Sequence, residues 1–171
     1  MINTDFKKIV ENLIDTFLNA GKVSLELRKK GLIKKIKSDN TPVSNGDLEV
    51  NKIITKKIKE LTPNIPIISE ETSDNKSLNN LENFWLIDPI DGTYDYINNL
   101  EEFTINAGLI LNNKSVAGII YAPAKKRMFY SYGKNFSFEL KNERKIKLDS
   151  SKNFDKNQIK FVSYTNKIKP E

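Results

Sequence analysis

Two aspartates separated by two residues are the part of the sequence with the clearest chemical potential. Asp88 follows the apolar run 84–87, and Pro89 and Ile90 lie between it and Asp91. Because Pro89 fixes its own φ angle and favours a turn, we expect Asp91 to fold back towards Asp88. Two carboxylates so close repel each other unless a cation lies between them, and their hard oxygen atoms favour Mg²⁺, Mn²⁺ or Ca²⁺.

The residues after this pair suit the binding of an anion. Gly92 permits close approach of the backbone, and Thr93 adds a hydroxyl group at the same corner. The segment 93–98 predicts the start of a helix, whose free N–H groups bind phosphate. A second interpretation stays open, because Asp, Pro and Gly are also the usual residues of a simple turn, in which Asp91 only caps the helix.

Further acidic residues stand where they could join the same corner. Glu70 and Glu71 follow the apolar run 66–69, so a second strand would deliver carboxylates, as a site for several metal ions requires. An exposed pair of glutamates also occurs without any function. Asp47 precedes an expected helix and has two interpretations, a helix cap or a member of the site.

The composition limits the chemistry to oxygen ligands. The 171 residues include neither Cys nor His, which excludes disulfides, cysteine nucleophiles, Ser-His hydrolases and imidazole metal sites. Lys and Arg number 28 against 22 Asp and Glu, which gives a net charge of +6. Residues 60–102 nevertheless hold ten acids and one base, and such a surface repels nucleic acid while it attracts divalent cations. We therefore expect no nucleic-acid partner.

The sequence gives little sign of a membrane protein. Its apolar runs are far shorter than the ~20 residues that span a bilayer, and the first residues lack the apolar core of a signal peptide. We expect a cytoplasmic protein, with peripheral attachment to the inner membrane as an alternative. The segment 141–171 holds nine bases and four acids, so a module that binds RNA or anionic lipid is the less favoured alternative.

Apolar residues at helical spacing predict two long helices. They recur every three or four residues over 5–30, and Gly31 is suited to end that helix. A second helix is expected over 47–61, before Pro63. The polar segment 37–44 between the two predicts a loop or a hairpin.

Short runs rich in Ile, Phe and Tyr predict a sheet after the helices. Strands are expected at 66–69, 84–87, 103–111, 115–121, 127–131 and 136–140. Consecutive strands joined by short turns favour an antiparallel meander, so the predicted fold class is α+β, with two long helices packed on an antiparallel sheet. We expect 1–140 to form this domain, and 141–171 to form a connection and the start of a truncated second domain, with a strand at 159–163.

These motifs resemble those of the inositol monophosphatase superfamily of magnesium-dependent phosphomonoesterases. The family signature runs from a Trp through Asp-Pro-[Ile/Leu]-Asp-Gly-Thr, and residues 85–93 match it without a gap. The family element Thr-Pro-Val-Thr-x-Ala-Asp resembles residues 41–47, with Ser44 in place of Thr and Gly46 in place of Ala. The family element Ser-Glu-Glu resembles residues 69–71.

Within the superfamily, the chain is most similar to the bacterial 3′(2′),5′-bisphosphate nucleotidases. The similarity lies in residues 37–43, 61–66, 102–106 and 118–123. The chain departs from the family at 94–96, where Tyr-Asp-Tyr stands in place of the frequent Lys-Glu-Phe. The resemblance implies hydrolysis of adenosine 3′,5′-bisphosphate to AMP and phosphate, a reaction of sulfur metabolism. An inositol monophosphatase-type activity is the alternative within the superfamily.

The resemblance also assigns roles to individual residues. It implies two or three Mg²⁺ ions, held by Glu70, Asp88, the carbonyl oxygen of Ile90, and Asp91. It implies a catalytic pair that activates the attacking water, Asp47 and Thr93. The implied binding site for the phosphorylated nucleotide is made by Glu70, Ile90, Asp91, Gly92 and Thr93.

The resemblance implies a further C-terminal part in members of the family, which we expect to be missing from this chain. Residues 141–171 hold no match to the family's Trp-Asp motif, which supplies another metal-ligating Asp. The resemblance therefore covers roughly the first two thirds of the family, and it predicts the N-terminal half of the layered fold without its C-terminal α/β domain. That missing domain or a second copy of the chain is the expected protein partner. An inactive fragment of the family is the alternative to an active enzyme.

Overall fold

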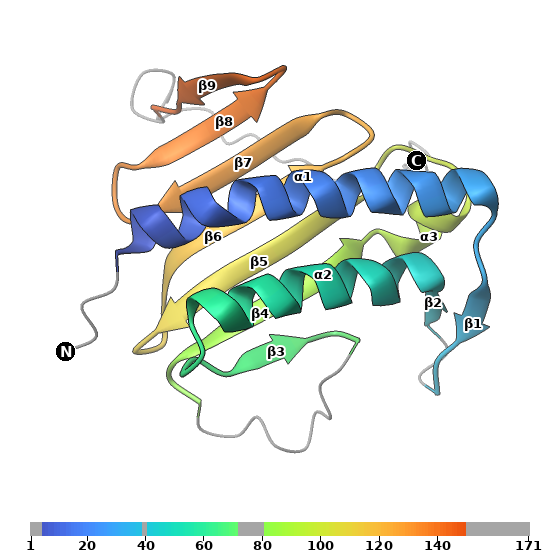
Figure 1. The fold of residues 1–171 in the computed structure, drawn as a ribbon, viewed down its shortest axis with the longest axis horizontal. Helices are drawn as coiled ribbons and strands as arrows, with labels where there is room; N and C mark the ends of the chain where they lie inside the picture. The colour runs from blue at the N-terminus through green and yellow to red at the C-terminus, as the bar shows by residue number, and fades with distance from the viewer. Residues whose placement is uncertain (1–4, 39–40, 72–80, 150–171) are drawn as a thin grey trace, which may run out of the picture.

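A computed structural model describes residues 5–38, 41–71 and 81–149 of the chain (Figure 1). In chain order the elements are α1 (Phe6–Lys30), β1 (Lys34–Ile36), β2 (Pro42–Ser44), α2 (Asn45–Leu61), β3 (Ile67–Ser69), β4 (Phe84–Asp91), α3 (Thr93–Ile97), β5 (Thr104–Leu111), β6 (Lys114–Ala122), β7 (Arg127–Tyr132), β8 (Ser137–Lys141) and β9 (Arg144–Lys147). The expected strand 159–163 lies outside the described residues.

The larger sheet has the strand order β3-β4-β5-β6-β7-β8-β9, and α1 and α2 lie side by side across one face of it (Figure 1). This arrangement confirms the predicted α+β fold with two long helices on a sheet. Every neighbouring pair is antiparallel except β3 and β4, which run parallel, so the sheet is mixed and the purely antiparallel prediction is wrong. The apolar pattern of a short strand gives no information on its direction, which explains the error.

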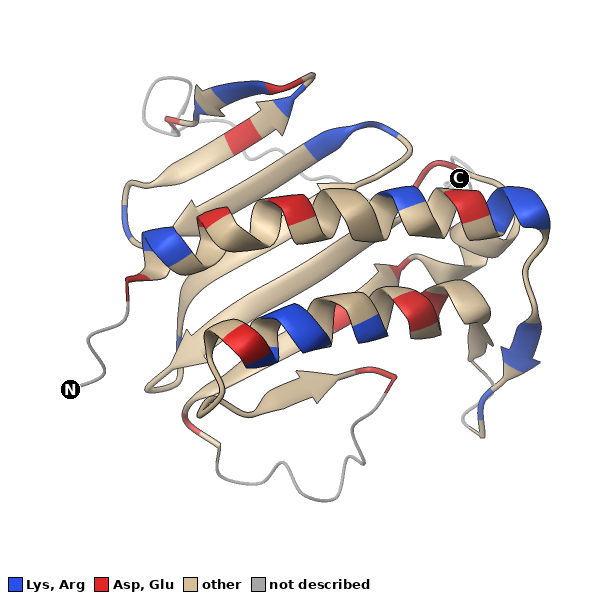
Figure 2. Ribbon diagram, in the orientation of Figure 1, with Lys and Arg blue, Asp and Glu red and all other residues tan. Residues whose placement is uncertain are grey.

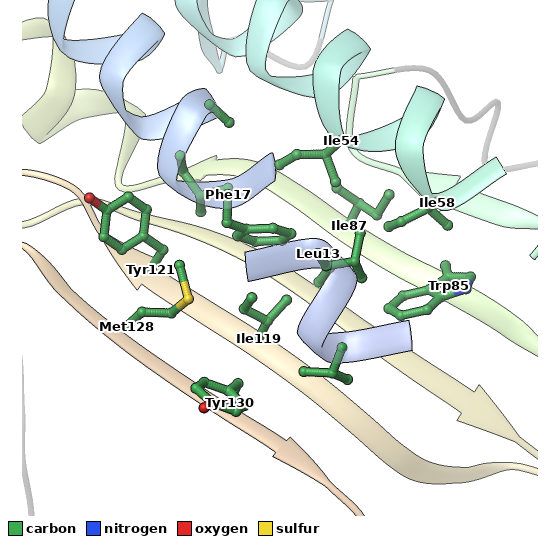
Figure 3. Close-up of a cluster of buried hydrophobic side chains, with 14 of the residues drawn as sticks. Leu13, Phe17, Ile54, Ile58, Trp85, Ile87, Ile119, Tyr121, Met128 and Tyr130 are labelled. Carbon is green, nitrogen blue, oxygen red and sulfur yellow. The ribbon is translucent and has the colours of Figure 1, made fainter. Parts of the chain in front are cut away.

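The core lies between the helices and the sheet, as the helical spacing requires. Leu13 and Phe17 of α1 and Ile54 of α2 are fully buried and point down to Trp85 and Ile119 of the sheet (Figure 3). Charged residues lie mainly along the outward surfaces of the two helices and near the ends of strands (Figure 2). No helix in the described part of the chain is long and apolar enough to cross a lipid bilayer.

The strand that carries the two aspartates is longer than expected. β4 continues through Pro89 to Asp91, and its pairing with β5 shifts register between Asp88 and Asp91. The expected turn at Pro89 is therefore wrong, because a bulge accommodates a residue that lacks the N–H group of a regular ladder. The chain turns instead at Gly92, whose φ of 89° lies in the left-handed region.

The C-terminal edge of the sheet also differs from the prediction. Residues 144–147 form β9, which pairs with β8, whereas 141–158 was expected to be a connection. The side chain of Lys145 lies 4.4 Å from the ring centre of Phe138, and its ammonium group is 3.1 Å from the Glu11 carboxylate of α1. β9 follows β8 through a two-residue turn at Asn142 and Glu143, which both have positive φ, so this hairpin forms without apolar alternation in β9.

Candidate active site

Asp47 is buried at the start of α2, and its carboxylate completes a capping box. Ser44 caps the helix: its hydroxyl accepts a hydrogen bond from the N–H of Gly46 at 3.1 Å. The N–H and hydroxyl groups of Ser44 both donate to Oδ2 of Asp47, at 2.8 and 2.6 Å. The helix therefore begins at Asn45, two residues earlier than expected, and Asp47 is the third residue of the helix rather than its cap.

The second carboxylate oxygen of Asp47 faces Thr93. The Thr93 hydroxyl lies 3.2 Å from Oδ1 of Asp47 and 2.9 Å from the carbonyl oxygen of Ile90, so both oxygens compete for its proton. Thr93 reaches this position because it begins α3 directly after Gly92. A Cβ atom at Gly92 would lie 2.7 Å from the carbonyl oxygen of Glu102, so this turn requires glycine.

Three further carboxylates lie at the ends of β3 and β4. Glu70 follows β3, and its N–H donates to the carbonyl oxygen of Ile87 at 3.2 Å, which sets it beside Asp88. Burial, followed by the charges of Glu70 and Asp91, raises the pKa of Asp88 to about 7. Glu70 and Asp91 thus both lie near enough to Asp88 for their charges to affect it.

Asp88 also has an oxygen atom without a partner. Its Oδ1 is buried and makes no hydrogen bond to any described residue. Directly opposite on β5 lies Asn106, whose amide nitrogen donates to Asp91 at 3.2 Å and whose buried Oδ1 likewise lacks a partner among the described residues. Two neighbouring oxygens without a donor between them need a proton on Asp88, another donor or a cation to offset the cost of their burial.

A lysine that the sequence did not assign to the site contacts two of its acids. The ammonium group of Lys37, from the hairpin between β1 and β2, lies 3.1 Å from the Glu70 carboxylate and 2.7 Å from that of Glu71. Burial lowers the pKa of Lys37, but the hydrogen bonds to Glu71 and Glu70 outweigh this and raise it overall. In the sequence, the only indication of a role for Lys37 was its place at the start of the predicted loop or hairpin 37–44.

A second residue that the sequence did not assign to the site, Asn51, contacts the strand that precedes Glu70. Asn51 lies one turn after Asp47 on α2 and is almost fully buried. Its Oδ1 accepts a hydrogen bond of 2.7 Å from the hydroxyl of Ser69, the residue before Glu70. One face of α2 thus contacts both parts of the site, since Asp47 meets Thr93 and Asn51 meets Ser69. The spacing of four residues was the available signal.

The oxygen atoms of Glu70, Asp88, Ile90 and Asp91 are chemically suited to bind a hard divalent cation. Among the described residues, no three acids converge closely enough to form a ready ion site. Lys37 explains part of this spread, because its ammonium group holds the Glu70 carboxylate. Carboxylate oxygens, a carbonyl oxygen and the unpartnered Oδ1 of Asp88 are nevertheless the hard ligands that Mg²⁺ prefers. The mutual repulsion of the acids also gives a cation a direct electrostatic benefit.

Comparison with known proteins identifies the family. The inositol monophosphatase family matches residues 5–168. The chain belongs to this family. A 3′(2′),5′-bisphosphate nucleotidase CysQ from Haemophilus influenzae is 34% identical over 144 residues, which make up 83% of this chain and 51% of that protein. The chain spans about half the length of the curated relatives it matches, less than the two thirds expected from the sequence.

Solved structures of the inositol monophosphatase family share the fold. The crystal structure of CysQ from Bacteroides thetaiotaomicron is 25% identical and has a TM-score of 0.60, over 81% of this chain and 50% of that one. An IMPase/NADP phosphatase complexed with Mg²⁺ and phosphate has a TM-score of 0.70 at 18% identity, over 80% of this chain and 52% of that one. At such an identity the second likeness establishes the fold alone.

Proposed function

We propose that this chain carries the catalytic half of a Mg²⁺-dependent phosphomonoesterase that acts on adenosine 3′,5′-bisphosphate. One observation carries the proposal: a hydroxyl hydrogen-bonded to a buried carboxylate lies beside a second cluster of acids with an unpartnered buried oxygen. Membership of the inositol monophosphatase family supports phosphate-ester hydrolysis in general. The nucleotide substrate follows from the resemblance to bisphosphate nucleotidases and from the CysQ relatives.

The chain's own residues supply proton transfer. In this proposal the Thr93 hydroxyl accepts a hydrogen bond from the attacking water and passes a proton towards Oδ1 of Asp47, 3.2 Å away. Asp47 suits this role because its Oδ2 is already fixed by both donors of Ser44, so the carboxylate has one free oxygen and one orientation. Release of phosphate from the 3′ ester leaves AMP.

Acidic residues would hold the metal ions at the neighbouring corner. We assign the ions to Glu70, Asp88, Asp91 and the carbonyl oxygen of Ile90. When bound, Mg²⁺ offsets phosphate charge, lowers the pKa of water and stabilises the departing oxygen. Glu70 must turn from Lys37 to contribute fully, because one oxygen of its carboxylate lies 3.1 Å from that ammonium group.

The backbone after Asp91 is the proposed phosphate contact. Gly92 turns the chain with a positive φ and Thr93 follows it, so their N–H groups are the assigned donors to the phosphate oxygens. Ile90 and Asp91 border the same turn. We expect these contacts to orient the ester relative to the Thr93 hydroxyl rather than to select the nucleoside.

The helix-free face of the sheet is the proposed contact for another domain. Leu86 and Ile120 are about half exposed there, at 52% and 48%. They line a hollow of about 540 Å³ that also includes Asp88 and Phe129. Since an apolar hollow beside the acids would leave the reaction open to water, we propose that a further domain of the family, or a second copy of this chain, covers it.

Phosphate release from adenosine 3′,5′-bisphosphate tests the proposal. We expect release that requires Mg²⁺, stops with a chelator and is lost in Asp88→Asn, because that variant removes the most buried acid of the metal corner. Asp15→Asn, an exposed substitution on the outer face of α1, is the matched control and should retain activity. Faster release from inositol 1-phosphate would instead favour the inositol monophosphatase-type activity.

Two negative results would replace the proposed enzyme by another function. Mg²⁺ binding without release from either substrate would identify an inactive fragment of the family. Salt-sensitive retention of RNA that persists in Asp88→Asn would identify the basic binding module, since counterion release gives phosphate contacts their salt dependence. Calorimetric titration with Mg²⁺ separates the first result from simple loss of folding.

A further inference from the structure

The side chain of Tyr96 fills the space above Gly46. Tyr96 lies on α3 and is fully buried. A Cβ atom built at Gly46 would lie 2.7 Å from Cε1 and 2.8 Å from Cζ of the Tyr96 ring, and closer still to its hydroxyl oxygen. Real Cβ atoms essentially never approach other atoms this closely, so Gly46 is required here for space rather than for backbone conformation.

Tyr96 cannot move aside to make room. Its hydroxyl donates a hydrogen bond of 2.7 Å to the carbonyl oxygen of Ser24 in α1. Its ring packs against Phe103 at a centroid distance of 4.9 Å, and the guanidinium group of Arg28 lies 5.7 Å from the ring centre. Arg28 is itself fixed by a hydrogen bond of 2.7 Å to the carbonyl oxygen of Leu100.

This contact joins the two helices that carry the proposed catalytic pair. Gly46 is the neighbour of Asp47 on α2, and Tyr96 lies three residues after Thr93, one turn along α3. The distance between Gly46 and Tyr96 therefore sets how closely α3 approaches the start of α2. Burial and, second, the charge of Asp47 raise the pKa of Tyr96, which agrees with this proximity.

We propose that Tyr96, packed on Gly46, is a positioning residue that sets the distance between the Thr93 hydroxyl and the Asp47 carboxylate. The proposal rests on the function proposed above for that pair. It also connects two departures from the family motifs, Gly46 in place of Ala and Tyr96 in place of Phe, because the two residues touch each other in space. In Tyr96→Phe the atom nearest to a Cβ at position 46 is lost together with the hydrogen bond to Ser24 that holds the ring, so the ring can shift away from a methyl group there.

Substitutions at both positions test this pairing. Gly46→Ala should push α3 away from α2, shift the NMR signal of the Thr93 methyl group and lower kcat by about 10- to 100-fold with little change in KM. Tyr96→Phe removes the hydroxyl and should have a smaller effect. Gly46→Ala combined with Tyr96→Phe should return both the methyl signal and kcat towards the wild-type values.

Matched controls exclude general effects of these exchanges. Gly118→Ala is the glycine control, because its Cβ would meet no atom closer than 3.6 Å. Tyr121→Phe is the tyrosine control, since Tyr121 is buried on β6 away from α2 and α3. Neither should move the Thr93 methyl signal or change the ratio of kcat to KM.

The possible outcomes separate the positioning role from the proposed function. If the wild-type chain releases no phosphate, the function fails, whereas the Thr93 methyl signals of the variants still decide the pairing. An unmoved signal in Gly46→Ala, or a double variant as perturbed as Gly46→Ala alone, overturns the pairing. If Gly46→Ala does not fold, a folded double variant with the wild-type signal supports the pairing, and an equally unfolded one contradicts it.

Discussion

The two halves of the site are built in opposite ways. At the Asp47–Thr93 half, three side-chain or backbone donors meet the two carboxylate oxygens of Asp47. At the Glu70–Asp88–Asp91 half, like charges face one another and Asp88 has a buried oxygen that receives no hydrogen bond from any described residue. Hydrogen bonds within the chain stabilise the carboxylate of the first half, whereas the acids of the second half repel one another. In our proposal a metal ion offsets that repulsion.

We expect the largest effect on activity and stability when the hydrogen bonds of the Asp47–Thr93 half are broken. Asp47→Asn replaces one carboxylate oxygen by an NH₂ group, which cannot accept the hydrogen bonds of Ser44 or Thr93. We therefore expect kcat to fall by about 10²–10⁴-fold and the free energy of unfolding to fall by roughly 1–3 kcal/mol. Steady-state kinetics and urea unfolding measure the two. Glu49→Gln, on the same turn of α2 but paired only loosely with Lys52, is the control. Unchanged stability in Asp47→Asn would mean that this half is not held by its hydrogen bonds.

The metal-free protein should lose stability as the pH rises. Asp88 has a pKa of about 7 in the folded chain against an ordinary value of 3.8, so the folded state holds its proton more tightly. Its contribution to stability is full below pH ~4 and is lost as the pH rises through about 7. Unfolding in chelator from pH 4 to 8 should show this slope in the wild type and a weaker one in Asp88→Asn. Identical slopes would remove the contrast between the two halves.

Removal of Asn51 tests whether α2 supports both halves. Asn51→Ala removes the buried hydrogen bond between the Ser69 hydroxyl and Asn51, so we expect a loss of roughly 1–3 kcal/mol in the free energy of unfolding. Mg²⁺ affinity should fall because Glu70 follows Ser69 directly, whereas the Thr93 methyl signal should stay in place. Calorimetric titration measures the affinity. Asn19→Ala, exposed on α1, controls for the exchange, and a weaker effect in Asn51→Ala than in this control would exclude the support.

We expect the smallest effect at Lys37, whose ammonium group partly offsets the negative charge of Glu70 and Glu71. Lys37→Met removes an ammonium group that competes with Mg²⁺ for Glu70, so Mg²⁺ should bind roughly two- to five-fold more tightly. Lys35→Met on the same hairpin is exposed and should leave the affinity unchanged. Weaker Mg²⁺ binding in Lys37→Met would show that the lysine assists the metal corner instead of competing with the ion.

Local patterns were sufficient to predict most of the helices and strands. Apolar spacing predicted both long helices and most strands, since a helix or strand buries one face in a regular period. Gly92 was assigned to a tight backbone approach, and the carbonyl oxygen of Glu102 does lie where its side chain would be. The bulge that carries β4 through Pro89 to Asp91 was missed, because it depends on pairing with β5.

Contacts between distant segments could not be predicted in the same way. Lys37 meets Glu70 and Glu71 only because the hairpin folds over the end of β3. Lys145 of β9 pairs with Glu11, more than one hundred residues earlier in the chain, only because the edge of the sheet lies beside the start of α1. No local period signals such contacts, since each depends on the positions of two elements at once.

By itself, the sequence indicated the family through its motifs, and with neither Cys nor His it limited the side chains that could bind a metal ion mainly to those with oxygen atoms. The tertiary structure decided which of the acids receive hydrogen bonds from the chain and which do not. Asp47 receives hydrogen bonds from Ser44 and Thr93, whereas no described residue donates one to the buried Oδ1 of Asp88. The physical reason is that charge, size and polarity belong to single residues, whereas burial and hydrogen-bond satisfaction belong to the space between elements.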